Sequence, residues 1–269
     1  MGLEEFYEQY PWPDKSGLSS LFRFMRIDTS NPNFIEHIFV RKKLYHSTPD
    51  NFNDPFECKP HFTLDENAKK IRNHLIKITI SYGRSRKESE ILISNLMKNP
   101  KFVKDAIMEA TKKSFGAMRI CCFTTDKNNL LFWSHYADSH MGFCMEFDAT
   151  VMPISMAYKV KYSNDYPVIE YPITEDARAL KPALIKSMDW KYEDEYRSVF
   201  IPTVNRLQHD GESLHLQGHE IKKVFLGARI LEDSKTLLLQ IIKESEFNPI
   251  IYQARLSNTS FKLKYEQIS

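Results

Sequence analysis

Residues 118–147 read MRICCFTTDKNNLLFWSHYADSHMGFCMEF and contain the pattern that decides the fold. Ile120–Thr124 and Gly142–Phe147 are apolar runs of strand length. Between them, Asp126–Asn129 is a helix-start signal and Leu130–Ala137 predicts a short helix. Two apolar strands joined by a helix indicate that this stretch lies in the core of a domain built from both strands and helices.

Further strands are predicted on both sides of this stretch. Strands are expected at 21–25, 44–47, 156–162, 196–201, 221–226, 250–255 and 261–265, and helices at 33–41, 174–188 (with Thr174 as N-cap) and 232–245. Residues 1–20 are expected to be irregular, because Pro11-Trp12-Pro13 fixes an extended turn.

A helical block interrupts the strands. Ile71, Leu75, Ile78 and Tyr82 follow one another at helical spacing, and the apolar pattern continues to about residue 117. We therefore predict an α+β fold with a mixed β core, as one domain over residues 1–269. The strands of 20–50 and 118–265 are expected to share one core, and the helical insertion at about 64–117 is expected to pack on one side as a cap.

Composition sets the class of protein. Of 269 residues, 42 % are hydrophobic, and 37 Lys and Arg against 35 Asp and Glu give a net charge of +2. This mix excludes disorder as the main state and offers no overall field for nucleic acid or acidic membranes. The basic runs Arg41–Lys43 and Arg84–Lys87 are interpreted either as solvated faces or as a local basic patch.

The targeting and metal signals are also informative. The first 13 residues lack a signal-peptide pattern, and no stretch approaches the roughly 20 apolar residues of a membrane span, so we expect a cytoplasmic protein with no membrane partner. Cys58, Cys121, Cys122 and Cys144 form no CxxC pair and no zinc spacing. We expect reduced, packed thiols and no resident metal.

Two clusters combine aromatic and polar residues. Phe52–Glu57 predicts a tight turn in which Asn53 and Asp54 bond to the backbone; it is interpreted either as a structural clamp or as a pocket wall. Trp133 and Tyr136 lie three apart on the predicted helix and share a face, which indicates either core packing or a shelf for a flat ligand.

The third cluster, Trp190–Arg197, crowds charges at the start of an apolar strand. Strand alternation puts Glu193, Glu195 and Arg197 on one face. Two readings stay open. The cluster is either a salt-bridged surface edge, or one glutamate is chemically active and the arginine sets its charge state.

Together these clusters resemble a bacterial family catalogued as domain of unknown function 2971. The resemblance covers about residues 20–230. Its motifs are Leu21–Phe24, Phe52–Glu57, Trp133–Asp138 with Gly142–Phe147, Glu193–Arg197 and Ile221–Gly227. The family name implies no activity.

The order of elements is also similar to that of ADP-ribosyltransferases, which use NAD as a substrate. The resemblance implies that Arg23 on the first strand, or alternatively His46 in Leu-Tyr-His-Ser-Thr, holds NAD. Arg23 departs from the histidine of the toxin-like branch. Tyr136 or Trp133 takes the place of the aromatic residue that stacks on nicotinamide. The catalytic glutamate is Glu195 or Glu193, and Arg197 is the partner of one of them and a further residue of the NAD site.

This resemblance implies cleavage of the nicotinamide–ribose bond, in which a carboxylate stabilises an oxocarbenium-like ribose without a metal. We therefore predict an NAD-dependent ADP-ribosyltransferase, a toxin or phage-defence effector with a protein or nucleic-acid acceptor and a possible antitoxin or neighbouring-gene partner. One alternative is a non-catalytic ligand-binding or interaction domain of the same fold. Another is a nuclease-like effector using Asp54, Glu57, Glu193 and Glu195 around Mg²⁺.

Overall fold

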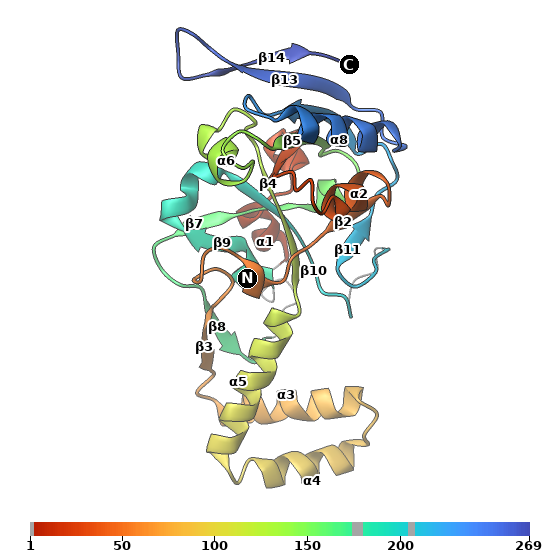
Figure 1. Ribbon diagram of the computed structural model, residues 1–269. Coiled ribbons are helices and arrows are strands. Elements are labelled where there is room, and N and C mark those ends of the chain that lie inside the picture. Colours follow the sequence, from red (N-terminus) through yellow and green to blue (C-terminus); the bar gives the residue numbers. More distant parts are fainter. Residues whose placement is uncertain (1–2, 174–179, 204–207) are drawn as a thin grey trace.

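A large mixed sheet organises the molecule. In the computed structural model (Figure 1), which describes residues 3–173, 180–203 and 208–269, eight strands pair in the order β14-β13-β12-β5-β1-β4-β10-β6. These strands are β1 (Ser20–Met25), β4 (Arg119–Thr124), β5 (Phe143–Asp148), β6 (Tyr158–Lys159), β10 (Glu195–Phe200), β12 (Ile221–Leu226), β13 (Ile250–Leu256) and β14 (Leu263–Gln267). Neighbours run antiparallel except β12 and β13, which are parallel.

The remaining elements surround this sheet. Paired short strands are β2 (Lys43–Tyr45) with β11 (Ser213–His215), β3 (His61–Leu64) with β8 (Val168–Tyr171), and β7 (Lys161–Ser163) with β9 (Ile185–Ser187). The helices are α1 (Leu3–Gln9), α2 (Asn33–Phe39), α3 (Ala68–Ser81), α4 (Arg86–Leu96), α5 (Pro100–Gly116), α6 (Leu130–His135) and α8 (Glu232–Lys243). The predicted α+β class is confirmed.

The sheet is weakly joined at its centre. β1 pairs with β5 along its whole length, from Ser20 opposite Asp148 to Met25 opposite Phe143. On its other side, β1 meets β4 at a single registered pair, Phe22 opposite Thr124. The strands therefore diverge beyond that pair, and side chains from both can line the space that opens between them.

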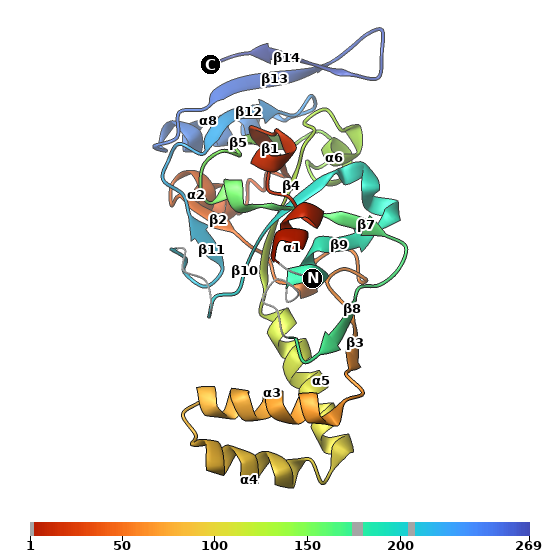
Figure 2. The ribbon, with the colours of Figure 1, turned by 180° about the vertical axis from the view of Figure 1, so that it is seen from behind.

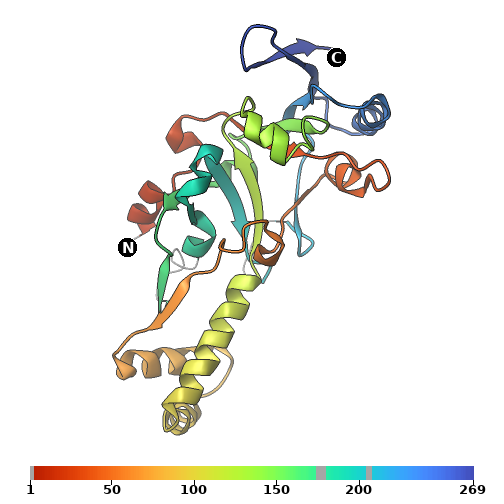
Figure 3. The same ribbon diagram turned by 60° about the vertical axis from the view of Figure 1, so that its left-hand side comes forward.

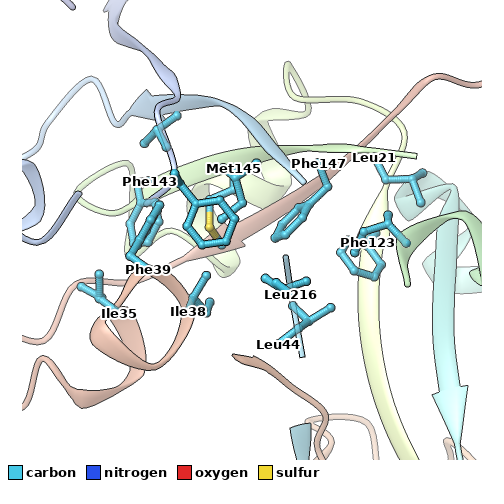
Figure 4. Close-up of a cluster of buried hydrophobic side chains, with 14 of the residues drawn as sticks. Leu21, Ile35, Ile38, Phe39, Leu44, Phe123, Phe143, Met145, Phe147 and Leu216 are labelled. Atoms are coloured by element: carbon cyan, nitrogen blue, oxygen red, sulfur yellow. The ribbon is translucent and has the colours of Figure 1, made fainter. Parts of the chain in front are cut away.

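Strand alternation builds a core on each face of the sheet. Leu21 of β1 points into the larger cluster, which α2 and α8 cover with Ile35, Phe39 and Leu238 (Figure 4). Phe22 and Phe24 point to the opposite face, where they pack against Trp133 of α6. Because successive side chains leave a strand on opposite sides, one apolar strand supplies both cores.

The helical insertion is an arm, and the expected cap over the sheet is not formed. Helices α3, α4 and α5 stand out from one end of the sheet in every view (Figures 1, 2 and 3). Their apolar faces meet one another, and Ile71, Val103 and Ile107 form a small separate cluster. At the root, Phe115 packs with Met118 against the body. Since the three helices bury their apolar faces against one another, they do not have to pack on the sheet.

Two other expectations from the sequence are wrong or fall outside the described residues. The N-terminal segment contains α1, whose Phe6 packs with Tyr10, Tyr158 and Leu184, so residues 1–20 are not wholly irregular. The predicted helix at 174–188 begins in residues 174–179, including Thr174, which lie outside the described part. Its second half is a 3₁₀ turn, Lys181–Leu184, followed by β9.

Two glycines allow close backbone approach near α6. A Cβ on Gly227 would lie 2.0 Å from the carbonyl oxygen of His140, and one on Gly142 would lie 2.1 Å from that of Met25. Both distances are far inside van der Waals contact with backbone atoms, which cannot rotate away. These glycines fix the loop after α6 against β1 and β12.

We predict that Gly227→Ala lowers the free energy of unfolding by about 2–3 kcal/mol or more, because the added methyl group overpacks a rigid backbone contact. Gly116→Ala is the matched control, since its Cβ would meet nothing within 4 Å. It should be neutral or stabilising by up to about 1 kcal/mol. Urea unfolding of both variants measures this, and equal effects would contradict the account.

Candidate functional site

The main pocket lies where β1 and β4 diverge, and it encloses about 430 Å³. This is within the range of roughly 300–1,000 Å³ for small-molecule sites. Strands, α6 and the turn after β2 all contribute to its wall. The lining residues are Phe22, Arg23, Phe24, Ser47, Asn51, Phe52, Asn53, Glu57, Ile120, Cys122, Phe123, Phe132, His135, Tyr136, Lys186, Glu193 and Glu195.

A buried ion cluster forms the floor of the pocket. The Nζ atom of Lys186 lies 2.5 Å from a carboxylate oxygen of Glu193, 2.9 Å from Glu57 and 3.3 Å from Glu195. All four side chains are at most 4 % exposed. Three carboxylates from distant parts of the chain therefore share one ammonium group.

Arg197 closes the cluster from behind. Its Nε and Nη2 donate to the two oxygens of Glu195 at 2.8 and 2.9 Å, and Nη2 also reaches Glu57 at 2.5 Å. Its Nη1 donates to the backbone carbonyl of Ala183 at 2.8 Å. Arg197 is fully buried and is a support of the pocket rather than part of its lining.

The local backbone explains why two neighbouring glutamates face inward. A 3₁₀ helix, Met188–Glu193, ends at Asp194, which has a left-handed φ of 40°. β10 starts at the next residue, so the turn at Asp194 directs both Glu193 and Glu195 to the cluster. Asp194 itself points outward and accepts from Thr125 while pairing with Lys159 at 3.2 Å. Glu193, Glu195 and Arg197 do point to one side, but Glu193 does so from the 3₁₀ helix and not by strand alternation. The predicted surface edge is wrong, because all three side chains are buried.

The two glutamates have opposite pKa shifts. Burial alone would raise the pKa of Glu195, but the charges of Arg197 and Lys186 lower it to about 2. Burial raises the pKa of Glu193, and Lys186 offsets this only in part. Glu195 is therefore ionised throughout the neutral range, while Glu193 is the carboxylate more able to take up a proton.

Lys186 stays charged in this site. Burial by itself would lower its pKa, but the carboxylates of Glu195, Glu57 and Glu193 raise it above the ordinary value. With all carboxylates ionised, the cluster holds three negative and two positive groups. The cluster therefore has a net charge of −1, and it faces the pocket.

Aromatic rings surround the ion cluster. The hydroxyl group of Tyr136 donates to Glu193 at 2.7 Å, so its ring is fixed against the pocket. The guanidinium of Arg197 lies 5.4 Å from the ring centre of Phe52, and Lys186 lies 4.8 Å from that of Trp190. Trp190 is held by a bond from its Nε1 to Asp54 at 2.8 Å. The turn of 52–57 thus acts as a pocket wall.

Arg23 supplies a positive group to the same pocket. Its Nη1 donates to the carbonyl of Cys122 at 3.0 Å and contacts the sulfur of Cys121, so the side chain bridges β1 and β4. Its Nε is buried and has no hydrogen-bond partner among the described residues. A buried donor without a partner is costly. A ligand anion would instead meet the Arg23 side chain where it lines the pocket.

Two predicted NAD-binding residues lie elsewhere. Trp133 is fully buried beneath α6, where its Nε1 donates to the carbonyl of Lys127 and its ring meets Phe24 edge to face. His46 is also fully buried; Nδ1 donates to the carbonyl of Leu44 and Nε2 accepts from Ser198. Burial lowers the pKa of His46 to about 3, so it is neutral. Neither side chain lines the pocket.

The structure therefore brings together Arg23, Tyr136, Glu193 and Glu195 around one pocket and keeps Arg197 behind them. The sequence reasoning missed Lys186, because its segment was predicted to be helical. Glu57 was grouped with Glu193 and Glu195 only in the nuclease-like alternative, around Mg²⁺, whereas the structure pairs it with Lys186 and Arg197. His135 is exposed at the pocket edge.

The comparisons with known proteins add no assignment. No family model matches this chain, and neither a curated protein nor a solved structure matches it. Across residues 3–173, 180–203 and 208–269, no group of three or more His, Cys, Asp or Glu side chains has the geometry to hold a metal ion. In that same part of the chain, no helix is long and apolar enough to cross a bilayer.

The pKa of Glu195 predicts how the cluster contributes to stability. Its folded-state pKa of about 2 lies below the unfolded value of about 4.5, so its contribution is present above about pH 4.5 and is lost as the pH falls towards 2. At pH 7, Glu195→Gln should lower the free energy of unfolding by about 3–5 kcal/mol, because it leaves buried cations without a partner.

Urea unfolding between pH 2.5 and 7 checks this. The difference between wild type and Glu195→Gln should shrink as the pH falls below 4.5. Glu266→Gln is the control, since Glu266 is exposed and pairs only with the exposed Arg255. A difference that does not depend on pH would contradict the assigned ionisation of Glu195.

Proposed function

We propose that the main pocket binds NAD and that this chain is an ADP-ribosyltransferase. The observation that carries the proposal is the pairing of two features in one aromatic-lined pocket. One is the net-negative cluster around Lys186, and the other is the cationic side chain of Arg23, which lines the same pocket. NAD has a flat, positively charged pyridinium ring at one end and a negatively charged diphosphate in its middle.

The charges of the pocket match those of NAD. The pyridinium ring fits between the rings of Tyr136 and Phe52, next to the carboxylates of Glu193 and Glu195. A phosphate oxygen would pair with the guanidinium of Arg23, which lines the pocket, through a charge-assisted hydrogen bond. The volume of about 430 Å³ suits the nicotinamide riboside half and leaves the rest of NAD at the open side.

The residues support a simple transfer reaction. The bond between the pyridinium nitrogen and the ribose carbon breaks, and its electron pair leaves with nicotinamide. Positive charge then develops on the ribose, where the permanently ionised Glu195 stabilises it. A nucleophilic oxygen or nitrogen of the acceptor forms the new bond and loses its proton. Glu193, with its raised pKa, is placed to accept that proton.

Nicotinamide release by purified protein tests the proposal. Glu195→Gln should lose about 10²–10³-fold in rate, while NAD affinity falls much less, because the charge matters most in the transition state. Tyr136→Phe keeps the ring and loses only the bond to Glu193, so it should show a smaller loss. Glu266→Gln is the matched control and should release nicotinamide like the wild type.

Circular dichroism establishes that each variant is folded. Glu195→Gln removes part of a buried ion cluster and could unfold for that reason. In that case, Tyr136→Phe provides a second test. Unchanged rates in folded Glu195→Gln would remove Glu195 from the mechanism. If only Glu193→Gln loses most of the rate of nicotinamide release, the catalytic role belongs to Glu193 and not to Glu195.

A second candidate is a domain that binds NAD, or a similar cationic ring, without turnover. It is favoured because other side chains of the protein already donate hydrogen bonds to the carboxylate oxygens of both glutamates. Both oxygens of Glu193 accept hydrogen bonds from Tyr136 and Lys186, and both oxygens of Glu195 accept from Arg197. Calorimetric binding of NAD without nicotinamide release would support this candidate over the transferase.

The nuclease-like alternative is less compatible with the cluster. The Nζ atom of Lys186 lies between Glu57, Glu193 and Glu195, where a divalent cation would have to bind. Arg197 adds a second positive charge, and Asp54 instead accepts from Trp190. The proposal of a toxin or phage-defence role, with its acceptor and antitoxin partner, rests on the family resemblance.

A further inference from the structure

The helical arm is strongly basic. Residues 68–116 contain twelve Lys and Arg against four Asp and Glu, a net charge of +8. The whole chain has a net charge of +2, so the residues outside the arm, with 25 basic and 31 acidic side chains, have a net charge of −6. Such asymmetry between parts of one chain is typical of binding to polyanions. An anionic ligand is attracted to the arm and repelled by the body.

The cations of the arm face solvent. Arg72 is half-buried, and the other eleven are exposed: Lys69, Lys70, Lys77, Arg84, Arg86, Lys87, Lys98, Lys101, Lys104, Lys112 and Lys113. Among the described residues, ion pairs in the arm involve only Lys70 with Asp65 and Arg86 with Glu90. Most of this charge is therefore available to a partner.

The tip of the arm combines charge with an aromatic ring. Tyr82 follows α3 and is 85 % exposed, and the next five residues include Arg84, Arg86 and Lys87. These residues lie at the turn between α3 and α4, away from the sheet (Figure 1). The capping box between Ser85 and Glu88 orders the start of α4, so the three cations are presented on a fixed turn.

An apolar groove adjoins Tyr82. It runs between α3 and α5, encloses about 520 Å³, and is lined by Leu75, Ile78, Tyr82, Ala106 and Ala110, among others. A flat apolar ring can pack in such a groove while an attached phosphate reaches the cations of the tip. Ile71 and Val103 are buried between the helices instead, and Ile107 of the same cluster also lines the groove.

We propose that the arm binds single-stranded nucleic acid. Its phosphates pair with Arg84, Arg86 and Lys87, and its unstacked bases pack on Tyr82 and in the groove. A single strand fits better than a duplex, because only unpaired bases are free to enter the groove. This inference goes beyond the proposed function and does not depend on it, since binding needs no NAD.

Fluorescence anisotropy with full-length protein and labelled 20-nucleotide DNA, RNA and duplex DNA tests the proposal. Wild type should bind the single strands more tightly than the duplex. The triple variant Arg84→Gln/Arg86→Gln/Lys87→Gln should lose at least about tenfold in affinity, and the slope of log affinity against log salt should fall by about 2. Tyr82→Ser should lose about tenfold through lost stacking.

The control is Lys243→Gln/Lys262→Gln/Lys264→Gln, which removes three exposed cations from the body and should bind like wild type. DNA and RNA present the same phosphates and similar bases, and comparing the two probes shows which of them the arm binds more tightly. Three results would each overturn the proposal. They are no binding of any oligonucleotide at low salt, equal losses in both triple variants, or binding to phosphatidylserine vesicles in preference to the single strands.

Discussion

The pocket depends on one interaction, the contact of the Lys186 ammonium with Glu57, Glu193 and Glu195. These side chains come from a turn after β2, from β9, from a 3₁₀ helix and from β10. None of the carboxylates would be stable when buried alone, and together with Arg197 they compensate one another. The cluster therefore ties four segments to one point and keeps Glu195 ionised beside the pocket.

The sheet provides the space in which this cluster acts. Because β1 and β4 share only one registered pair, the sheet opens at its centre, and Arg23 bridges the opening. Two glycines hold the loop after α6 against β1 and β12, which fixes Tyr136 at the rim. The fold thus places an aromatic wall, a cation and a net-negative floor in one pocket, which is the basis of the proposed NAD site.

Much of the fold could be predicted from the sequence, because its main strands are apolar runs. The strand predicted at 221–226 is β12, and the one at 120–124 lies within β4. Lys186 could not be found in this way, since its burial depends on carboxylates far away in the chain. Trp133 and Tyr136 share a helical spacing, but only Tyr136 reaches the pocket, because it follows the end of α6 while Trp133 packs beneath it.

A crystal structure with an NAD analogue whose ribose ring oxygen is replaced by carbon tests the central claim most directly, because such an analogue is not cleaved. The account predicts the pyridinium ring between Tyr136 and Phe52, with Lys186 still bonded to its three carboxylates and a phosphate oxygen paired with the guanidinium of Arg23. An analogue bound outside this pocket, or Lys186 turned to solvent with its carboxylates apart, would contradict it.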